Sequence, residues 1–142
     1  ASYMYDKNVI IVDFGTALTF TVLSKSKEIL GVNIVPGLHT AINSLYKNTA
    51  KLPTIGIDLP DKVIGKNTVH SIQSGIMFGY VGLVKEMLIK IKSELVGETK
   101  VIATGGLSKF AKPLKRYFND ILPTLTLDGM IKILDENKKK KS

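Results

Sequence analysis

A run of four β-branched residues, Val9 to Val12, constrains this 142-residue chain more than any other feature of its sequence. An uninterrupted aliphatic run predicts a strand over Asn8 to Phe14 that is buried on both of its faces. The run ends at Asp13, whose carboxylate needs an opening to solvent, a cation or backbone hydrogen-bond donors to stay ionised. Gly15 to Ala17 then predicts a tight turn.

The rest of the chain predicts α/β layers, with helices packed on a sheet. Alternating side chains predict two more strands that complete an antiparallel three-strand meander, and Lys100–Thr104 predicts a parallel strand that extends it. The other strands of the meander are predicted over Leu18–Leu23 and Glu28–Val35. Helices are predicted over Leu38–Tyr46, over about 28 residues from a cap at Asn67 or Thr68, over Leu107–Tyr117 with a break near Pro113, and over Asp128–Leu134.

Three glycines, Gly75, Gly79 and Gly82, lie near one side of the long predicted helix. Each glycine costs a helix about 1 kcal/mol relative to alanine. The stripe therefore predicts that another backbone or a ligand comes very close to this side. Gly97 is predicted to cap the C-terminus of the helix.

The composition argues against several classes of protein. The sequence has no cysteine, and His39 and His70 have no partners at metal-ligand spacing, which argues against a disulfide framework, a thiol nucleophile and a zinc site. No stretch reaches about 18 uncharged apolar residues, so the sequence predicts no membrane-spanning segment. No signal peptide opens the chain. We therefore expect a cytoplasmic protein with no membrane partner.

The net charge of +8 includes a run of lysines, Lys138 to Lys141, before the last residue. Such a run is typical of a solvated, frayed end. We expect a domain over residues 1–136 and a disordered lysine-rich tail over residues 137–142. Nucleic acid is not an expected partner, because Arg116 is the single arginine and no aromatic residues interleave the lysines.

Two glycine turns that follow predicted strands could hold a nucleotide. In Asp13-Phe14-Gly15-Thr16-Ala17, successive backbone N–H groups and a hydroxyl suit phosphate oxygens. A hairpin turn with a capping aspartate explains the same residues. In Thr104-Gly105-Gly106, two glycines would let a ring or ribose lie on the backbone, and a helix N-terminus favours phosphate. A short strand-to-helix turn is the alternative.

A third motif, Gly65 to Thr68, precedes the long predicted helix. The free N–H groups of a helix start attract anions, but Asn67 and Thr68 are equally ordinary as helix caps. The Gly-x-x-x-x-Gly-Lys-Ser/Thr spacing is absent, which excludes a P-loop. The sequence also has no Gly-x-Ser-x-Gly, His-Glu-x-x-His or Gly-x-Gly-x-x-Gly motif.

An ordered set of segments resembles the C-terminal half of type III pantothenate kinases, also called the Bvg accessory factor (Baf) family. The resemblance covers about residues 5 to 134, and the order of the set makes it specific. The segments are Val12–Ala17, Val35–Gly37, Thr49–Pro53, Ile64–Thr68, Gln73–Gly75, Gly79–Leu83, Val101–Leu107 and Leu125–Gly129.

This resemblance implies a fold and an activity. The fold would be one ribonuclease H-like half of the acetate and sugar kinase, Hsp70 and actin fold, with ATP bound between two halves. The activity would be ATP-dependent phosphorylation of pantothenate, the first step of coenzyme A biosynthesis. Mg²⁺ and a monovalent cation, K⁺ or NH₄⁺, would be the cofactors.

The resemblance also implies roles for single residues. Asp13 is similar to the aspartate of the monovalent-cation site. Thr68 is similar to a threonine that reaches pantothenate from the neighbouring subunit, which implies a homodimer along the long helix over residues 67–96. The residues implied in ATP binding are Gly15, Thr16 and Ala17 at the phosphates and Gly105 and Gly106 at the adenosine.

Two motifs of the family are not found in this sequence. They are Asp-x-Gly-Asn-Thr, which binds phosphate, and Gly-x-Asp-Arg, which supplies the catalytic base and a substrate-binding arginine. Both are expected upstream of Ala1, so no catalytic residue is expected in this chain, and the 142 residues alone are predicted to be inactive. One alternative is a non-catalytic nucleotide-binding or transcription-regulatory module of the same fold. Another is a different sugar or acyl kinase, against which the context of Thr68 argues.

Overall fold

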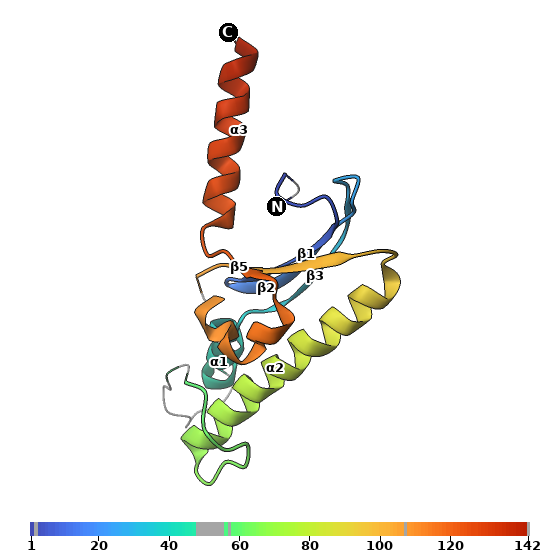
Figure 1. Cartoon of the computed structure of the whole chain (residues 1–142). Helices are drawn as coiled ribbons and strands as arrows, with labels where there is room; N and C mark the ends of the chain where they lie inside the picture. The colour runs from blue at the N-terminus through green and yellow to red at the C-terminus, as the bar shows by residue number, and fades with distance from the viewer. Residues whose placement is uncertain (2, 48–55, 57, 107, 142) are drawn as a thin grey trace.

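The fold is built on one mixed sheet of five strands, in the order β3-β2-β1-β4-β5 (Figure 1). The computed structural model describes residues 1, 3–47, 56, 58–106 and 108–141. Within them, β1 pairs antiparallel with β2 and parallel with β4. The predicted meander with a parallel extension is therefore confirmed. The strands are β1 (Asn8–Phe14), β2 (Ala17–Leu23), β3 (Ile29–Pro36), β4 (Thr99–Thr104) and β5 (Asp120–Ile121).

Helix α2 (Thr68–Glu94) crosses one face of this sheet. It begins where the sequence predicts, because the side chain of Asn67 accepts a hydrogen bond of 2.9 Å from the backbone N–H of His70. The prediction that Gly97 caps the other end is wrong. Leu95 is the cap, with its N–H donating to the carbonyl of Lys92, and Gly97 lies beyond it with a φ of 91° in the connection to β4.

Two predictions for the C-terminal part of the chain need correction. The segment η1 (Ser108–Tyr117) is a 3₁₀ helix that contains Pro113, whose missing N–H is poorly tolerated inside an α-helix. Helix α3 (Leu125–Lys141) is much longer than predicted and includes most of the expected disordered tail. Asp135 lies four residues before Lys139, and lysines at a helix C-terminus interact favourably with its dipole. Helix α1 (Leu38–Lys47) matches its prediction closely. The segment Thr49–Pro53, which is one of those that carry the family resemblance, lies outside the described residues.

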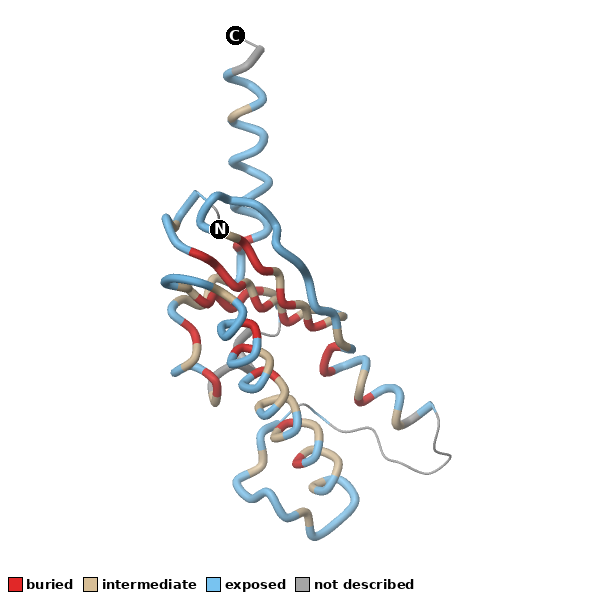
Figure 2. Tube along the Cα trace, turned by 90° about the vertical axis from the view of Figure 1, so that its right-hand side faces the viewer, coloured by how far each residue is buried: buried red, intermediate tan, exposed pale blue. Residues whose placement is uncertain are grey.

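The larger core lies between the sheet and α2, as the buried stretches in Figure 2 show. The side chains of Ile10, Val12 and Phe20 meet Val84 and Leu88 there. The opposite face of the sheet holds a smaller cluster, whose buried members are Val9, Leu23, Ile102 and Leu125. The central strand β1 is thus buried on both faces, as its sequence predicts.

Within the described part of the chain, α2 is the one helix with the length and hydropathy to cross a membrane. Core helices of globular proteins meet the same criterion. Val84, Leu88 and Ile91 of α2 are buried against the sheet, so we assign this helix to the core.

Tyr5 connects the N-terminal segment to β5 beneath the smaller cluster. Its hydroxyl donates a hydrogen bond of 2.6 Å to Asp120. Burial, and then the hydrogen bond and charge of Asp120, raise the pKa of Tyr5 from 10.0 to about 12. Because the folded pKa is the higher one, this contribution to stability is fully present below pH 10 and is lost as the pH rises towards 12.

We expect Tyr5→Phe to lower the free energy of unfolding at pH 8 by about 1 kcal/mol, because Asp120 loses its donor. The difference in the free energy of unfolding between Tyr5→Phe and the unchanged chain should narrow as the pH rises from 10 to 12. Urea denaturation followed by circular dichroism measures both effects. Tyr3→Phe is the matched control, since Tyr3 is exposed. A difference in the free energy of unfolding that widens as the pH rises would contradict this account.

Candidate functional site

The two glycine turns leave neighbouring parallel strands at the same edge of the sheet. Asp13 at the end of β1 is in register with Thr104 at the end of β4. The turn that follows β1 and the turn that follows β4 therefore lie side by side. In α/β sheets, ligands bind in the crevice outside the carboxyl ends of parallel strands. We call these two turns, residues 13–17 and 104–106, the paired turns.

Gly105 is the point at which the paired turns touch. Its φ is 92°, which favours glycine over every other residue. A Cβ at this position would overlap the carboxylate oxygen Oδ1 of Asp13 and would come within 2.8 Å of the carbonyl oxygen of Phe14. Glycine is thus required both by the backbone conformation and by the close approach of Asp13.

The turn after β1 is held rigidly while its hydroxyl stays accessible. The N–H of Gly15 donates to the carbonyl of Ala17 at 3.1 Å, which closes the turn. The carbonyl of Thr16 accepts two hydrogen bonds, one from the N–H of Gly37 at 3.0 Å and one from the hydroxyl of Thr40 at 2.8 Å. Thr16 itself is exposed, so its side chain can meet a ligand without any backbone movement.

Three residues that support this turn were not singled out by sequence analysis. Gly37 and Thr40 bind the carbonyl of Thr16, as described above. The hydroxyl of Tyr80 on α2 donates to the carbonyl of Pro36, next to Gly37, and burial raises the pKa of Tyr80. Gly37 and Tyr80 lie in segments that carry the family resemblance, Val35–Gly37 and Gly79–Leu83, but nothing local in the sequence links Thr40 or Tyr80 to the turn.

The chemistry of the paired turns suits a nucleotide with a cation. Asp13 is half-buried, and its carboxylate lies against Gly105, beside the carbonyl of Phe14. Carboxylate and carbonyl oxygens are the ligands of hard cations. Gly106 is exposed, and no described residue lies within 4 Å of the position of a Cβ there, which leaves room for a flat ring over the backbone. In the described ranges, no group of three or more His, Cys, Asp or Glu side chains could hold a metal ion.

The structure does not bring Thr68 to the paired turns. Thr68 is exposed at the first residue of α2. Tyr80, which contacts the support of the turn, lies twelve residues further along the helix, or roughly 18 Å at 1.5 Å per residue. A role for Thr68 at the paired turns of its own chain would need a large movement. The prediction that it serves a neighbouring subunit stays a prediction.

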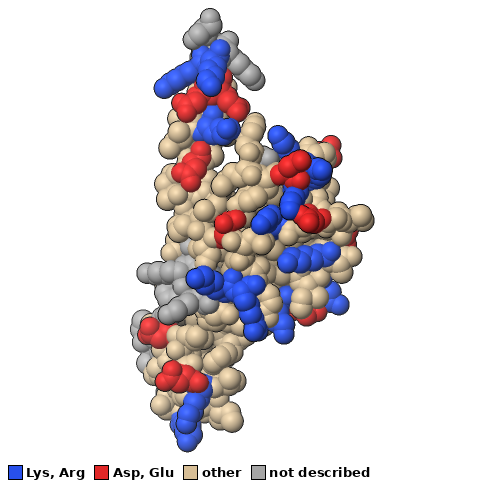
Figure 3. All heavy atoms as spheres, viewed as in Figure 1, with Lys and Arg blue, Asp and Glu red and all other residues tan. Residues whose placement is uncertain are grey.

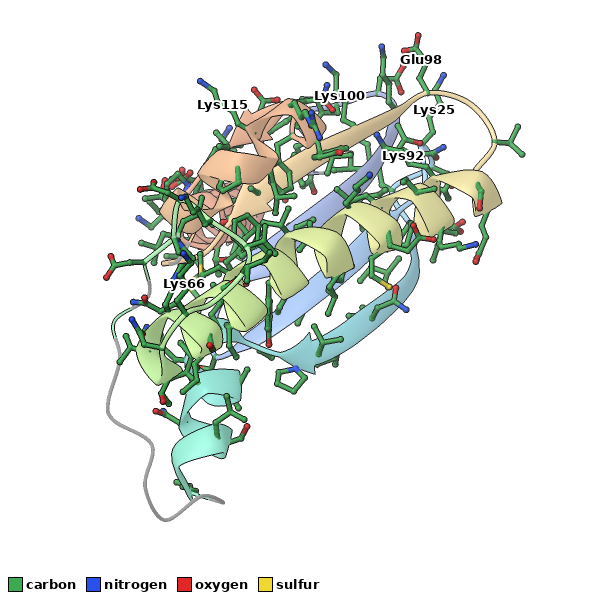
Figure 4. The ribbon with its side chains drawn as sticks, turned by 90° about the horizontal axis from the view of Figure 1, so that it is seen from below. Lys25, Lys66, Lys92, Glu98, Lys100 and Lys115 are labelled. Carbon is green, nitrogen blue, oxygen red and sulfur yellow. The ribbon has the colours of Figure 1, made fainter. Side chains whose placement is uncertain are left out.

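Ion pairing concentrates at the other end of the sheet. Lys7 pairs with Glu98 and lowers the pKa of its carboxyl group, and Lys25 lies 3.8 Å from Asp6. Figure 4 shows Lys25 and Glu98 at the opposite end of the molecule from Lys66, which precedes α2. On the face drawn in Figure 3, lysines and carboxylates lie beside one another. The charge of that face is therefore mixed in sign.

Comparison with known proteins identifies the family. A family model described as type III pantothenate kinase matches residues 1–90. The chain belongs to the type III pantothenate kinase family. Two curated relatives named type III pantothenate kinase, from Dehalococcoides mccartyi strains CBDB1 and ATCC BAA-2266 / KCTC 15142 / 195, are each 44% identical over 138 residues, which is 97% of this chain.

The match covers 52% of the first relative and 54% of the second, so the chain spans about half the length of these type III pantothenate kinases. A solved structure is titled as a conserved putative Baf family transcriptional activator from Campylobacter jejuni. Its match covers 97% of this chain and 62% of the Campylobacter jejuni chain. Its TM-score is 0.65 at 24% identity, which shows a shared fold.

Proposed function

We propose that this chain is the ATP- and cation-binding half of an enzyme that phosphorylates pantothenate with ATP, the first step of coenzyme A biosynthesis in the cytoplasm. The fold would be the C-terminal ribonuclease H-like half of the acetate and sugar kinase, Hsp70 and actin fold, over residues 1–136. The observation that carries the proposal is the contact of Gly105 with Asp13, which unites the paired turns in a chain of this family.

Each paired turn has a distinct task in this proposal. The exposed hydroxyl of Thr16 and the backbone of Gly15 and Ala17 receive the phosphates. The open backbone of Gly105 and Gly106 receives the adenosine. Phosphoryl transfer depends mainly on positioning and on neutralisation of charge, and a turn fixed by two hydrogen bonds to the carbonyl of Thr16 suits that task.

Asp13 would hold a monovalent cation, K⁺ or NH₄⁺, together with carbonyl oxygens of the same turns. Mg²⁺ is bound mainly by substrate phosphates and water, with few protein carboxylates, which agrees with the absence of an acidic cluster in the described ranges. When bound, these cations supply neutralisation of phosphate charge. The catalytic base belongs to the half of the enzyme outside this chain.

The long helix would form a homodimer in which Thr68 reaches the pantothenate of the partner. The glycine stripe supports this arrangement. Nothing in the described part of the chain lies within 4 Å of the position of a Cβ at Gly75, Gly79 or Gly82. An apolar groove runs over this stripe and includes Leu45, Ile72, Ile76 and Leu83. The glycines predict the close approach of another backbone or of a ligand, and in this proposal a second copy supplies it.

The test joins this chain to the part of the CBDB1 relative that lies outside the match. We expect pantothenate-dependent release of ADP from the joined protein and none from the 142 residues alone. Asp13→Asn should lower kcat/KM by about 100-fold and abolish activation by K⁺, because it removes the carboxylate that would hold the cation whose positive charge neutralises the phosphates. Asp6→Asn is the matched control, since the exposed Asp6 precedes the opposite end of β1.

Two results would overturn the proposal. One is a joined Asp13→Asn protein that keeps full activity and its response to K⁺. The other is binding of ATP, measured by equilibrium dialysis, with no pantothenate-dependent ADP release from the joined protein. That second result would instead favour the non-catalytic nucleotide-binding or regulatory module.

A further inference from the structure

The peptide group between Pro36 and Gly37 connects helix α2 to the turn that follows β1. Its N–H, which belongs to Gly37, donates to the carbonyl of Thr16 at 3.0 Å. Its carbonyl, which belongs to Pro36, accepts a hydrogen bond from the hydroxyl of Tyr80 on α2. Because a peptide group is planar, these two hydrogen bonds hold one rigid unit from its two ends. The hydroxyl of Tyr80 is thus one peptide group away from the turn after β1.

This peptide group lies tightly against the turn. A Cβ at Gly37 would overlap the carbonyl oxygen of Gly15 and lie 2.5 Å from that of Thr16. Pro36 is in register with Ala17, where β3 ends beside the start of β2. A rotation of the peptide group would therefore press on backbone atoms of the turn or break its hydrogen bond to Thr16.

Tyr80 is held in place, and keeps its proton, where it meets this peptide group. Its ring packs against the larger core between the sheet and α2, which limits the movement of the hydroxyl. Burial raises the pKa of Tyr80, so the hydroxyl remains a donor near neutral pH. Donation to a carbonyl polarises the peptide group and strengthens the hydrogen bond that its N–H makes. The Tyr80 hydroxyl therefore strengthens the bond from Gly37 to Thr16.

We propose that Tyr80 is a positioning residue for the phosphates of the nucleotide, and that it acts through the peptide group between Pro36 and Gly37. This inference rests on the proposed function, because it takes the exposed hydroxyl of Thr16 as the group that meets the phosphates. Tyr80 does not touch the nucleotide itself. It holds the backbone of Thr16 in place, while the side chain of Thr16 receives the ligand.

Tyr80→Phe tests the hydroxyl alone, because phenylalanine keeps the ring in the core. The Kd for ATP is measured on the joined protein by equilibrium dialysis. We expect this Kd to rise about fivefold, while the KM for pantothenate stays within about twofold of its value in the unchanged protein. Tyr117→Phe is the matched control and should leave both constants unchanged. Tyr117 also packs against the larger core, but its hydroxyl accepts a hydrogen bond of 3.0 Å from the exposed Arg116.

Two further measurements separate positioning from a general loss of stability. In the 142-residue chain, the amide hydrogen of Gly37 should exchange faster in Tyr80→Phe than in Tyr117→Phe, because its hydrogen bond to Thr16 is weaker. In a joined protein that already carries Gly37→Ala, Tyr80→Phe should raise the Kd for ATP no further. Both substitutions act on one hydrogen bond, so their effects should not add.

The outcomes distinguish failure of this inference from failure of the proposed function. If the unchanged joined protein does not bind ATP, the proposed function is wrong and the inference falls with it. If it binds ATP and Tyr80→Phe binds ATP equally well, the inference alone is wrong. Equal changes for ATP and pantothenate, or unchanged exchange at Gly37, would also overturn the inference. So would an undiminished effect of Tyr80→Phe beside Gly37→Ala, because Tyr80 would then act in some other way.

Discussion

Gly105→Ala is expected to lower the free energy of unfolding by about 3 kcal/mol, the largest effect of any single methyl group discussed for this protein. A left-handed φ costs an alanine about 1 to 2 kcal/mol, and the φ of Gly105 is 92°. Overpacking adds about 1 to 3 kcal/mol, because the new Cβ would overlap Asp13 Oδ1 and press on the carbonyl of Phe14. Urea denaturation of the 142-residue chain measures the loss.

Gly106→Ala is the matched control for this substitution. It changes the adjacent residue, whose Cβ would meet no described residue within 4 Å. We expect the free energy of unfolding of this variant to stay within about 0.5 kcal/mol of that of the unchanged chain. Equal losses from both substitutions would mean that the paired turns are not in contact. In the joined enzyme, Gly106→Ala should instead weaken ATP binding, because its methyl group would occupy the space left for the adenosine.

The sequence predicts the sheet well because its signals are local. The aliphatic run of β1 and the alternation of β2 determine which faces they bury, and the cap at Asn67 determines where α2 starts. The contact between the paired turns is different in kind. Asp13 and Gly105 are more than 90 residues apart, and only the parallel pairing of β1 with β4 brings them together.

The errors have physical causes that a local pattern does not contain. The run of lysines at the C-terminus is typical of a frayed end, yet α3 continues to Lys141 because acidic residues one turn earlier and the helix dipole favour it. Gly97 is typical of a helix cap, but the chain leaves the helix two residues earlier at Leu95. The exposure of β3 and α3 was not predicted either, because an apolar strand or helix in a sequence does not reveal whether another part of the molecule packs against it.

Gly37 shows how a residue that appears only to end a strand can control a candidate site. A Cβ at Gly37 would overlap the carbonyl oxygen of Gly15 and lie 2.5 Å from that of Thr16. Both are backbone atoms, so the turn itself would have to move. We expect Gly37→Ala to lower the free energy of unfolding by about 2 kcal/mol and, in the joined enzyme, to lower kcat/KM by about tenfold or more.

Gly31→Ala separates displacement of the turn from the general cost of altering a glycine. Gly31 lies in β3, and a Cβ there would meet nothing within 4 Å in the part of the chain that the structure describes. Because glycine weakens a strand by roughly 0.5 to 1 kcal/mol relative to alanine, this variant should be as stable as the unchanged chain or slightly more stable. If Gly37→Ala lost stability but kept full kcat/KM in the joined enzyme, the turn after β1 would not position phosphate. If it lost kcat/KM while Gly31→Ala did not, the hydrogen bond from Gly37 to Thr16 would be part of what holds the nucleotide in place.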